Sequence, residues 1–295
     1  MKNNKNTVRG ASILLLATFT WGWFGILFRI TGSNVPLFFQ TSVRSIVTSL
    51  LLLVILLISR KWSSLHANEW GWVTARGLFG LLASALFFTA VNKIPIGTAY
   101  FSFYTGSTLG GYAVGRLMFK EQLNKVKWLA LLLTLTGLAL IYSFDFGVNY
   151  IHLSVALGAG ICASLWNTLT KKLPSNIEAS QLGFLDNSML VVLGLAISLL
   201  IKESWTFPTM EKWWLANYMV GVLQVVTGIL VVKGFRYVEA QIGSLILLME
   251  ILFGIILGYV FYNEALALRT ILGGLLIISG VSIPEIISLR KTTSQ

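Results

Sequence analysis

The sequence is poor in charge. Charged residues make up 11% of its 295 positions, whereas soluble proteins average about 25%. Acidic residues are scarcest, with 11 Asp and Glu against 22 Lys and Arg. Because 56% of the residues are hydrophobic, an ordinary soluble domain is excluded, and we expect a chain that lies mostly in a lipid bilayer. The net charge of +11 is spread over short loops rather than gathered in a patch, so no nucleic-acid partner is expected.

The residues that usually build disulfides, metal sites and catalytic centres are also scarce. The single cysteine, Cys162, can form no intramolecular disulfide. The two histidines, His66 and His152, lie in or beside predicted loops and lack the spacing of metal ligands. No HExxH motif and no GxSxG motif lies on an apolar segment. We therefore expect no metal and no cofactor, and an intramembrane enzyme becomes a minor alternative.

Long apolar runs are what the sequence has in abundance. A membrane-spanning helix needs about 20 apolar residues, and the sequence offers ten such segments with short connections. The ten predicted spans are 8–30, 36–58, 71–91, 97–119, 126–144, 151–171, 179–201, 214–235, 240–261 and 268–288. The sequence thus predicts an all-α polytopic membrane protein with no soluble domain.

The basic residues predict the orientation of these spans. With the N-terminus inside, the inner segments carry sixteen Lys and Arg residues and the outer segments four. Such an excess marks the cytoplasmic side, so both termini are expected in the cytoplasm of a multi-pass protein of the cell (plasma) membrane. The first apolar run continues to about Ile30, which is too long for a signal peptide. Arg29 and Arg76 lie near span ends, where we expect them to reach toward the membrane surface.

The sequence repeats weakly at a shift of 143 residues. "FKEQL" (119–123) ends the fourth predicted span and "YNEAL" (262–266) ends the ninth, and glycines match at the same shift. Five spans separate the copies, so the halves would cross the membrane in opposite senses, as in inverted-repeat transporters. This predicts two five-helix halves, 1–146 and 147–295. Chance matching is the alternative, because glycine and leucine are common here.

Taken together, these features resemble the drug/metabolite transporter superfamily, EamA type. The resemblance is carried by "TWGW" (20–23) in the first span, Pro36 and Arg44 in the second, and the two glycine-rich segments that end in "FKEQL" and "YNEAL". It implies alternating access, with predicted spans one to four and six to nine around a cavity and the fifth and tenth packed outside. One departure is Glu250, near a position where many members have a proline.

Glu250 lies near the middle of the ninth predicted span. A charge there costs roughly 2.5–3.5 kcal/mol on insertion scales, so we expect it to face a cavity, pair with a cation or be protonated. At helical spacing it shares a stripe with Gly243, Leu247, Gly254 and Gly258. The repeat maps this stripe onto Tyr100, Tyr104, Ser107, Gly111 and Gly115 of the fourth span. We therefore predict that Ser107 and Glu250 approach each other, with the two tyrosines beside them.

Further polar and aromatic residues lie inside predicted spans. The complete set of candidate substrate-binding residues is Glu250, Asp186, Arg44, Tyr100, Tyr104, Ser107, Trp21, Trp166, Asn167 and Gln224. Structural alternatives stay open: Arg44 could pair with Glu250 or with Asp186, and the aromatic residues could serve packing alone. Glu121 and Glu264 end spans, where holding the fold is the simpler role.

These residues favour a secondary-active or facilitative transporter of a small metabolite, with an amino acid or amphipathic amine as the first choice. Glu250 and Asp186 would hold an amine or a proton, and Arg44 would hold a carboxylate. Proton coupling and facilitated exchange both remain open. The alternatives are carriers of organic anions, nucleotide-like or drug-like solutes, and, further off, a channel or scaffold. The lipid bilayer and a small-molecule substrate are the expected partners, for a monomer or a homodimer.

Overall fold

The computed structural model describes residues 4–32, 35–142 and 149–293. Within these residues the chain is helical and contains no strand. The helices are α1 (Asn4–Thr31), α2 (Leu37–Ser59), α3 (Ala67–Val91), α4 (Ile96–Phe119), α5 (Lys125–Ile141), α6 (Tyr150–Thr168), the 3₁₀ helix η1 (Leu169–Lys172), α7 (Ala179–Leu200), α8 (Lys212–Phe235), α9 (Ala240–Leu247), α10 (Met249–Tyr262) and α11 (Leu268–Thr293). Seven segments of the described chain are long and apolar enough to cross a membrane.

The predicted spans correspond to these helices with two internal differences. The segment predicted as 240–261 is interrupted at Leu248, which separates α9 from α10. The segment predicted as 151–171 ends as an α-helix at Thr168 and tightens into η1. Neither break contains a proline or glycine, so sequence signals for helix ends did not reveal them.

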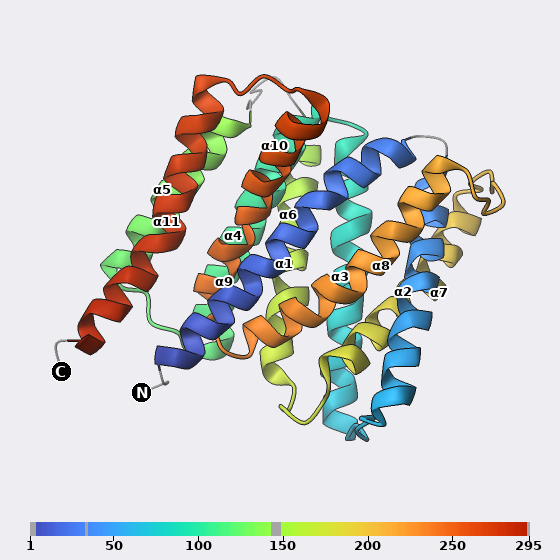
Figure 1. Cartoon of the computed structure of the whole chain (residues 1–295), viewed down its shortest axis with the longest axis horizontal. Helices are drawn as coiled ribbons and strands as arrows, with labels where there is room; N and C mark the ends of the chain where they lie inside the picture. The colour runs from blue at the N-terminus through green and yellow to red at the C-terminus, as the bar shows by residue number, and fades with distance from the viewer. Residues whose placement is uncertain (1–3, 33–34, 143–148, 294–295) are drawn as a thin grey trace.

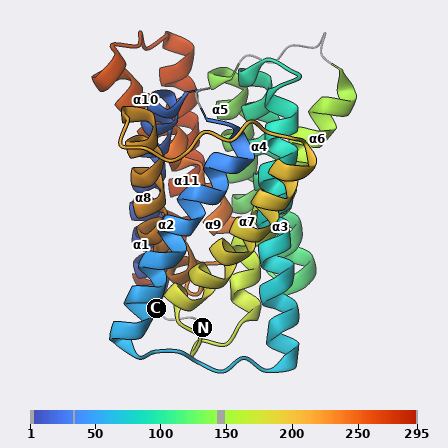
Figure 2. The ribbon, with the colours of Figure 1, turned by 90° about the vertical axis from the view of Figure 1, so that its right-hand side faces the viewer.

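The helices form one bundle (Figures 1 and 2). α5 and α11 pack side by side at one edge, and α2 packs against α7 at the opposite edge. Between them, α6 packs against both α3 and α4, and α1 packs against α8 and α10. The start of α1 and the end of α11 lie at the same end of the bundle, called here the terminal end (Figure 1).

Small residues bring the central helices into backbone contact. A Cβ atom added to Gly106 of α4 would lie 2.1 Å from the carbonyl oxygen of Leu157 in α6. One added to Gly160 of α6 would lie 1.9 Å from the carbonyl oxygen of Phe103 in α4. Close backbone approach at glycines is the usual way that helices associate inside membranes. It holds the middle of α6 against α4.

α5 and α11 make two glycine contacts that are related to each other by the 143-residue shift. A Cβ on Gly137 would lie 2.6 Å from the carbonyl oxygen of Gly273, and a Cβ on Gly280 would lie 2.8 Å from that of Ala130. A shift of 143 residues turns the first contact into the second, with the two helices exchanged.

The strained backbone positions follow the same shift. The described non-glycine residues with positive φ are Arg60, Lys120, Lys202 and Asn263, with φ between 52° and 56°. They form two pairs separated by 142 (202 − 60) and 143 (263 − 120) residues. Such residues are uncommon because the Cβ atom crowds the backbone in this region. The repeat shift thus relates positive-φ residues at or just after the ends of α2 and α7 and of α4 and α10.

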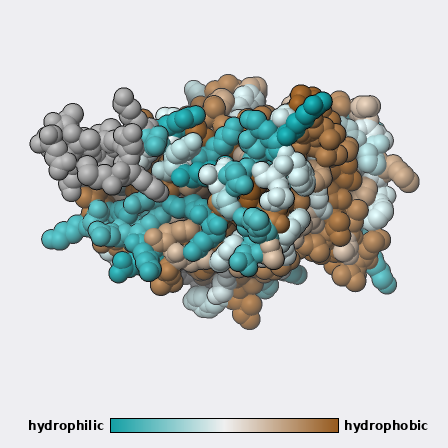
Figure 3. Space-filling view, turned by 90° about the horizontal axis from the view of Figure 1, so that it is seen from below, coloured by the Kyte–Doolittle hydropathy of each residue, from teal (hydrophilic) through white to brown (hydrophobic). Residues whose placement is uncertain are grey.

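Apolar side chains cover the sides of the bundle. Large fractions of several apolar side chains are exposed, for example 68% of Leu57, 61% of Leu132 and 64% of Val192. The face seen from below in Figure 3 is instead largely hydrophilic across its middle, with hydrophobic residues toward the rim. This distribution suits apolar sides against lipid and polar ends in water.

Candidate binding site in two adjoining cavities

Two cavities adjoin inside the bundle. The smaller has a volume of about 180 Å³ and the larger of about 470 Å³. Their shared wall consists of Trp21, Phe24 and Phe28 from α1 with Trp166 and Asn167 from α6. Small-molecule sites are typically concave, apolar and furnished with a few polar groups, and this pair of cavities has that character.

The larger cavity contains Glu250 at the beginning of α10. At the break between α9 and α10, the N–H of Leu248 donates to the carbonyl of Leu245 at 3.1 Å, and the N–H of Ile251 donates to that of Leu248 at 3.1 Å. Hydrogen bonds therefore span three residues instead of four at this point. Glu250 lies in the first turn of α10, where the helix dipole favours a negative charge.

Three tyrosines stand around this carboxylate. Tyr104 of α4 donates a hydrogen bond from its hydroxyl to Oε1 of Glu250. The three rings stack on one another. The distance between ring centroids is 6.0 Å for Tyr104 and Tyr100, 6.1 Å for Tyr104 and Tyr142, and 5.9 Å for Tyr100 and Tyr142. Tyr142 follows the last residue of α5, at the end of a span that was expected to lie outside the cavity, so sequence reasoning missed it.

Glu250 faces the cavity without a counter-ion among the described residues. In the part of the chain that the structure describes, no basic side chain forms an ion pair with it. The alternative that it pairs with Arg44 is therefore wrong. Its side chain is half-buried because it faces the cavity, and an ionised carboxylate there needs a positive partner or a proton.

Ser107 and the glycines of the Glu250 stripe also border the larger cavity. Ser107 is buried in its wall. A Cβ added to Gly254 would meet no atom within 4 Å, whereas one added to Gly111 would lie 1.8 Å from Oγ of Ser244. α4 and α9 are thus in tight contact near the terminal end, and the cavity separates α4 from α10 beyond it.

The smaller cavity contains Asp186 together with a partner that the sequence did not reveal. Asp186 of α7 forms an ion pair with Arg76 of α3, and their side chains are only 4% and 2% exposed. Arg76 also donates from Nε to the carbonyl oxygen of Trp166 at 2.9 Å, and Nε1 of Trp166 donates to Oδ2 of Asp186 at 3.3 Å. These bonds join α3, α6 and α7.

One expectation and one structural alternative for these residues are wrong. Arg76 does not reach toward the membrane surface, because its guanidinium turns inward to Asp186. Asp186 does not pair with Arg44, because Arg76 occupies that role. The pair joins residues 110 positions apart, and helical periodicity cannot show which spans are neighbours.

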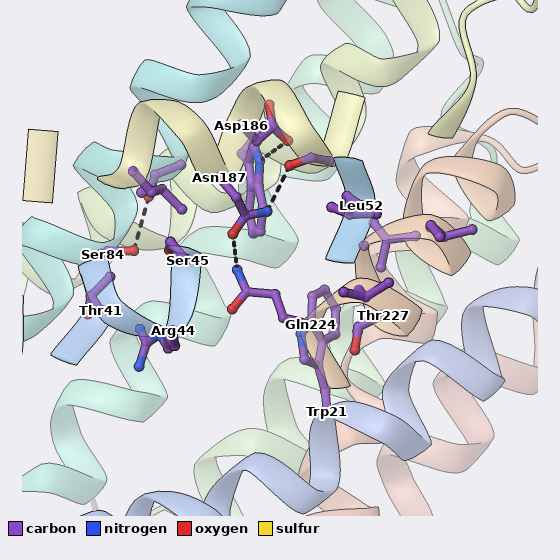
Figure 4. Close-up of a pocket in the computed structure, with 18 of the residues that line it drawn as sticks. Trp21, Thr41, Arg44, Ser45, Leu52, Ser84, Asp186, Asn187, Gln224 and Thr227 are labelled. Atoms are coloured by element: carbon purple, nitrogen blue, oxygen red, sulfur yellow. Dashed lines mark hydrogen bonds between the residues drawn. The ribbon is translucent and has the colours of Figure 1, made fainter. Parts of the chain in front are cut away.

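A polar bridge crosses the smaller cavity. Gln224 of α8 donates from Nε2 to Oδ1 of Asn187 at 3.0 Å, and Asn187 donates from Nδ2 to the carbonyl oxygen of Gly183 at 2.8 Å. Figure 4 shows Gln224 reaching across toward Asn187 of α7. The sequence singled out Gln224 but not Asn187.

Arg44 of α2 is a buried cation without a carboxylate. It is 9% exposed and lines the smaller cavity. Its guanidinium carbon lies 5.2 Å from the centre of the Phe28 ring, and among the described residues it forms no ion pair. In Figure 4 it lies apart from Asp186, beside Thr41 and Ser45. An isolated buried charge is costly, so this position suits the binding of an anion.

The ten residues predicted from the sequence therefore divide between two adjoining chambers. Glu250, Tyr100, Tyr104 and Ser107 line the larger one; Asp186, Arg44 and Gln224 line the smaller one; Trp21, Trp166 and Asn167 line both. Within the described residues, no group of three or more His, Cys, Asp or Glu side chains could hold a metal ion. Among the described residues, the chambers thus present the Glu250 carboxylate and the Arg44 guanidinium, neither in an ion pair, on either side of an aromatic wall.

Comparison with known proteins gives a consistent result. The model of the EamA-like transporter family matches residues 8–143 and again residues 151–283. The pseudopaline exporter CntI of Pseudomonas aeruginosa, in strains UCBPP-PA14 and PAO1, is 22% identical over 274 residues, which cover 91% of this chain and 93% of the exporter. A solved crystal structure with 17% identity has a TM-score of 0.80 and is matched over 96% of this chain and 98% of its own, which shows the shared fold. The chain belongs to the EamA-like transporter family.

Proposed function

We propose that this chain carries a small zwitterionic metabolite, an amino acid or a related amphipathic amine, across the plasma membrane by alternating access. The observation that carries the proposal is Glu250, a carboxylate that faces the larger cavity without a basic partner among the described residues. A solute amine would supply the missing charge, and a proton would supply it when no solute is bound.

The surroundings of Glu250 suit an organic cation. Aromatic faces attract cations through the ring quadrupole, and the three stacked tyrosines stand beside the carboxylate. Arg44, in the adjoining cavity, would take the solute's carboxylate through paired N–H donors. The apolar body of the solute would lie against the shared wall of Trp21 and Trp166.

Alternating access requires two oppositely oriented halves, which we place at residues 1–146 and 147–295. The repeated α5–α11 contacts and the paired positive-φ residues support this division, as does the double match to the family model. Our proposal counts ten transmembrane spans, with α9 and α10 forming one interrupted span. Interrupted spans near the bilayer centre are a common feature of transporter sites.

The larger cavity reaches the end of the bundle opposite the terminal end. Its lining includes Arg29 and Glu264, which are 53% and 44% exposed. Since the distribution of basic residues favours cytoplasmic termini, we assign this structure to a state open toward the outside. The same site would open to the cytoplasm in the opposite state.

A carrier of a different solute class is the second candidate. The relative CntI is named as a pseudopaline exporter, and this favours outward transport of a metabolite that need not be an amino acid. Arg44 and the volume of the larger cavity would serve an organic anion as well. The requirement for Glu250 separates the two candidates, because a simple anion gains nothing from a carboxylate.

The test is uptake into proteoliposomes at two pH values, with amino acids, polyamines, quaternary amines and organic acids as solutes. We expect saturable transport of zwitterions, and Glu250→Gln should abolish it or remove its pH dependence while the protein still reaches the membrane. Glu211→Gln is the matched control, because Glu211 is an exposed acid at the start of α8. Wild-type rates and pH profile in Glu250→Gln would overturn the proposal.

A further inference from the structure

Two helices of this protein end in the same local structure. α4 is followed by Lys120 with φ 54° and then Glu121, and α10 is followed by Asn263 with φ 52° and then Glu264. The backbone N–H of Glu121 donates to the carbonyl oxygen of Gly115 at 2.9 Å, and that of Glu264 points to the carbonyl oxygen of Gly258 at 3.5 Å.

Both carboxylates fold back over the preceding helix. A Cβ added to Gly115 would lie 2.5 Å from Oε2 of Glu121, and a Cβ added to Gly258 would lie 2.5 Å from Oε2 of Glu264. Each glutamate is therefore held against a glycine by the same turn, 143 residues apart (264 − 121). The turns around the two glutamates are alike, so a difference between their partners must come from the packing of the helices.

Their partners nevertheless differ. Glu121 is 8% exposed and closes the start of α9: Oε1 accepts from the backbone N–H of Ala240 at 2.7 Å and Oε2 from that of Gln241 at 3.1 Å. Lys171 adds an ion pair at 2.9 Å. A carboxylate at a helix N-terminus satisfies free amides and interacts favourably with the dipole. Glu121 thus fastens α4 to α9 at the terminal end.

Glu264 has no such helix to cap in this state. It is exposed, lines the mouth of the larger cavity and pairs with Arg29. The helix that corresponds to α9 in the other half is α4, which begins at Ile96 after Pro95, and no side chain caps its N-terminus. At the repeat shift Ala240 corresponds to Gly97 (240 − 143), whose backbone N–H lies in the first turn of α4, at the opposite end of that helix from Glu121.

Two glycines related by the repeat shift also differ in how tightly they pack. Gly111 is packed tightly against Ser244 of α9, whereas Gly254, its counterpart at the repeat shift, faces empty space in the larger cavity. α4 is therefore closed against α9 at one end of the bundle and separated from α10 at the other. Exchanging the two halves would exchange the closed end and the open end.

We propose that Glu264 is a gate residue that acts in turn with Glu121. In the state open at the terminal end, Glu264 leaves Arg29 and accepts a hydrogen bond from the N–H of Gly97 in the first turn of α4, the counterpart of Ala240 at the repeat shift (240 − 143). Glu121 at the same time releases Ala240 and Gln241, and Gly254 closes on α4. This inference rests on the alternating access proposed above, and it assigns to each end of the membrane its own closing contact.

The two contacts of Glu264 differ in strength, and this makes the proposal testable. Its pair with Arg29 is exposed to solvent, where ion pairs contribute little. Its contact with the Gly97 amide would be buried like that of Glu121, where hydrogen bonds to a charged group contribute much more. Removal of the Glu264 charge should therefore weaken mainly the state that is open at the terminal end.

Thiol labelling in nanodiscs reports both ends without any substrate. Cys162→Ala first removes the single native cysteine. Gln241→Cys places a reporter at the closed end, where Gln241 is fully buried and its side-chain atoms have no hydrogen-bond partner among the described residues. Gly254→Cys places a second reporter at the open end. A charged maleimide then reaches each position only when that end is open.

Substitution of the two glutamates should change the labelling rate of the closed-end reporter, the cysteine at position 241, in opposite directions. Glu121→Gln should raise the labelling rate at position 241 about tenfold, since a charged hydrogen-bond cap is lost from the closed end. Glu264→Gln, at the far end of the bundle, should lower the same rate about tenfold because the state that exposes position 241 loses its own cap. Labelling at position 254 should fall in Glu121→Gln and should not fall in Glu264→Gln.

Two further variants serve as controls. Glu211→Gln should leave both reporters unchanged, and Arg29→Gln, which frees Glu264, should raise labelling at position 241. If Glu264→Gln leaves labelling at position 241 unchanged or raises it, the proposal is overturned. The Glu264 variants alter an exposed side chain, so they decide the matter even if Glu121→Gln fails to fold. If the proposed solute is wrong, the transport assay will fail, but the thiol-labelling rates will not change.

Discussion

The smaller and larger cavities each hold an acidic residue inside an apolar segment, but the two acids have opposite surroundings. Asp186 has its cation built in, because Arg76 and Trp166 both donate to it and the ion pair is almost fully buried. Glu250 has one neutral donor, Tyr104, and an open cavity in front of it. The first arrangement joins three helices, and in our proposal a solute or a proton neutralises the second.

The two buried arginines differ in the same way. Arg76 is paired with Asp186, whereas Arg44 is buried in the same cavity and pairs with no carboxylate in the part of the chain that the structure describes. The uncompensated groups are thus one acid and one base in adjoining chambers. Our proposal assigns function to the two buried charges that lack a partner among the described residues, a distinction that a sequence cannot show.

The largest expected effect comes from breaking the compensated pair. Arg76→Met should lower the free energy of unfolding by about 3–5 kcal/mol, because it leaves Asp186 buried without a counter-ion. Thermal unfolding in detergent measures this loss. The double variant Arg76→Met with Asp186→Leu should recover most of it. A double variant as unstable as Arg76→Met alone would mean that the pair is not the cause.

Arg44→Gln sharpens the contrast between the two arginines. We expect unchanged or higher thermal stability, because an unpaired buried charge is removed. The KM for a zwitterionic solute should rise about 10- to 100-fold, as is typical when a hydrogen-bonded charge is lost. Uptake kinetics in proteoliposomes measure this, with Arg269→Gln as the exposed control. A loss of stability like that of Arg76→Met would assign Arg44 a structural role.

Tyr104→Phe should have the smallest effect of the three. It removes one hydrogen bond to Glu250 and keeps the stacked ring, so transport should fall about fivefold. Tyr150→Phe is the matched control, because Tyr150 is 70% exposed at the start of α6. Initial uptake rates compare the two variants. Equal rates in both would show that the Tyr104 hydroxyl does not position Glu250.

Much of the fold follows from patterns that a sequence displays directly. Long apolar runs predicted the helices, and the repeat at 143 residues predicted that α4 and the α9–α10 segment correspond. Helical spacing also placed Tyr100, Tyr104 and Glu250 on facing stripes, and the structure brings these residues into one cluster. Local periodicity suffices in these cases because each prediction concerns one helix or one shift.

The remaining features depend on which helices are neighbours. The Arg76–Asp186 pair links α3 to α7, and no pattern within either helix indicates the other. Tyr142 joins the tyrosine cluster from the end of a helix that packs mainly outside the cavity. The break at Leu248 lies in an unbroken apolar run. Tertiary packing sets all three.

The most direct test of the central claim measures binding, as solute-dependent thermal stabilisation, which does not require transport. It compares one zwitterionic solute with its amine-only and acid-only analogues in wild type, Glu250→Gln and Arg44→Gln. The claim is that opposite uncompensated charges in adjoining cavities recognise the two ends of the solute. We predict that wild type prefers the zwitterion, that Glu250→Gln no longer prefers it over the acid-only analogue, and that Arg44→Gln no longer prefers it over the amine-only analogue. Wild-type discrimination in both variants would contradict the account.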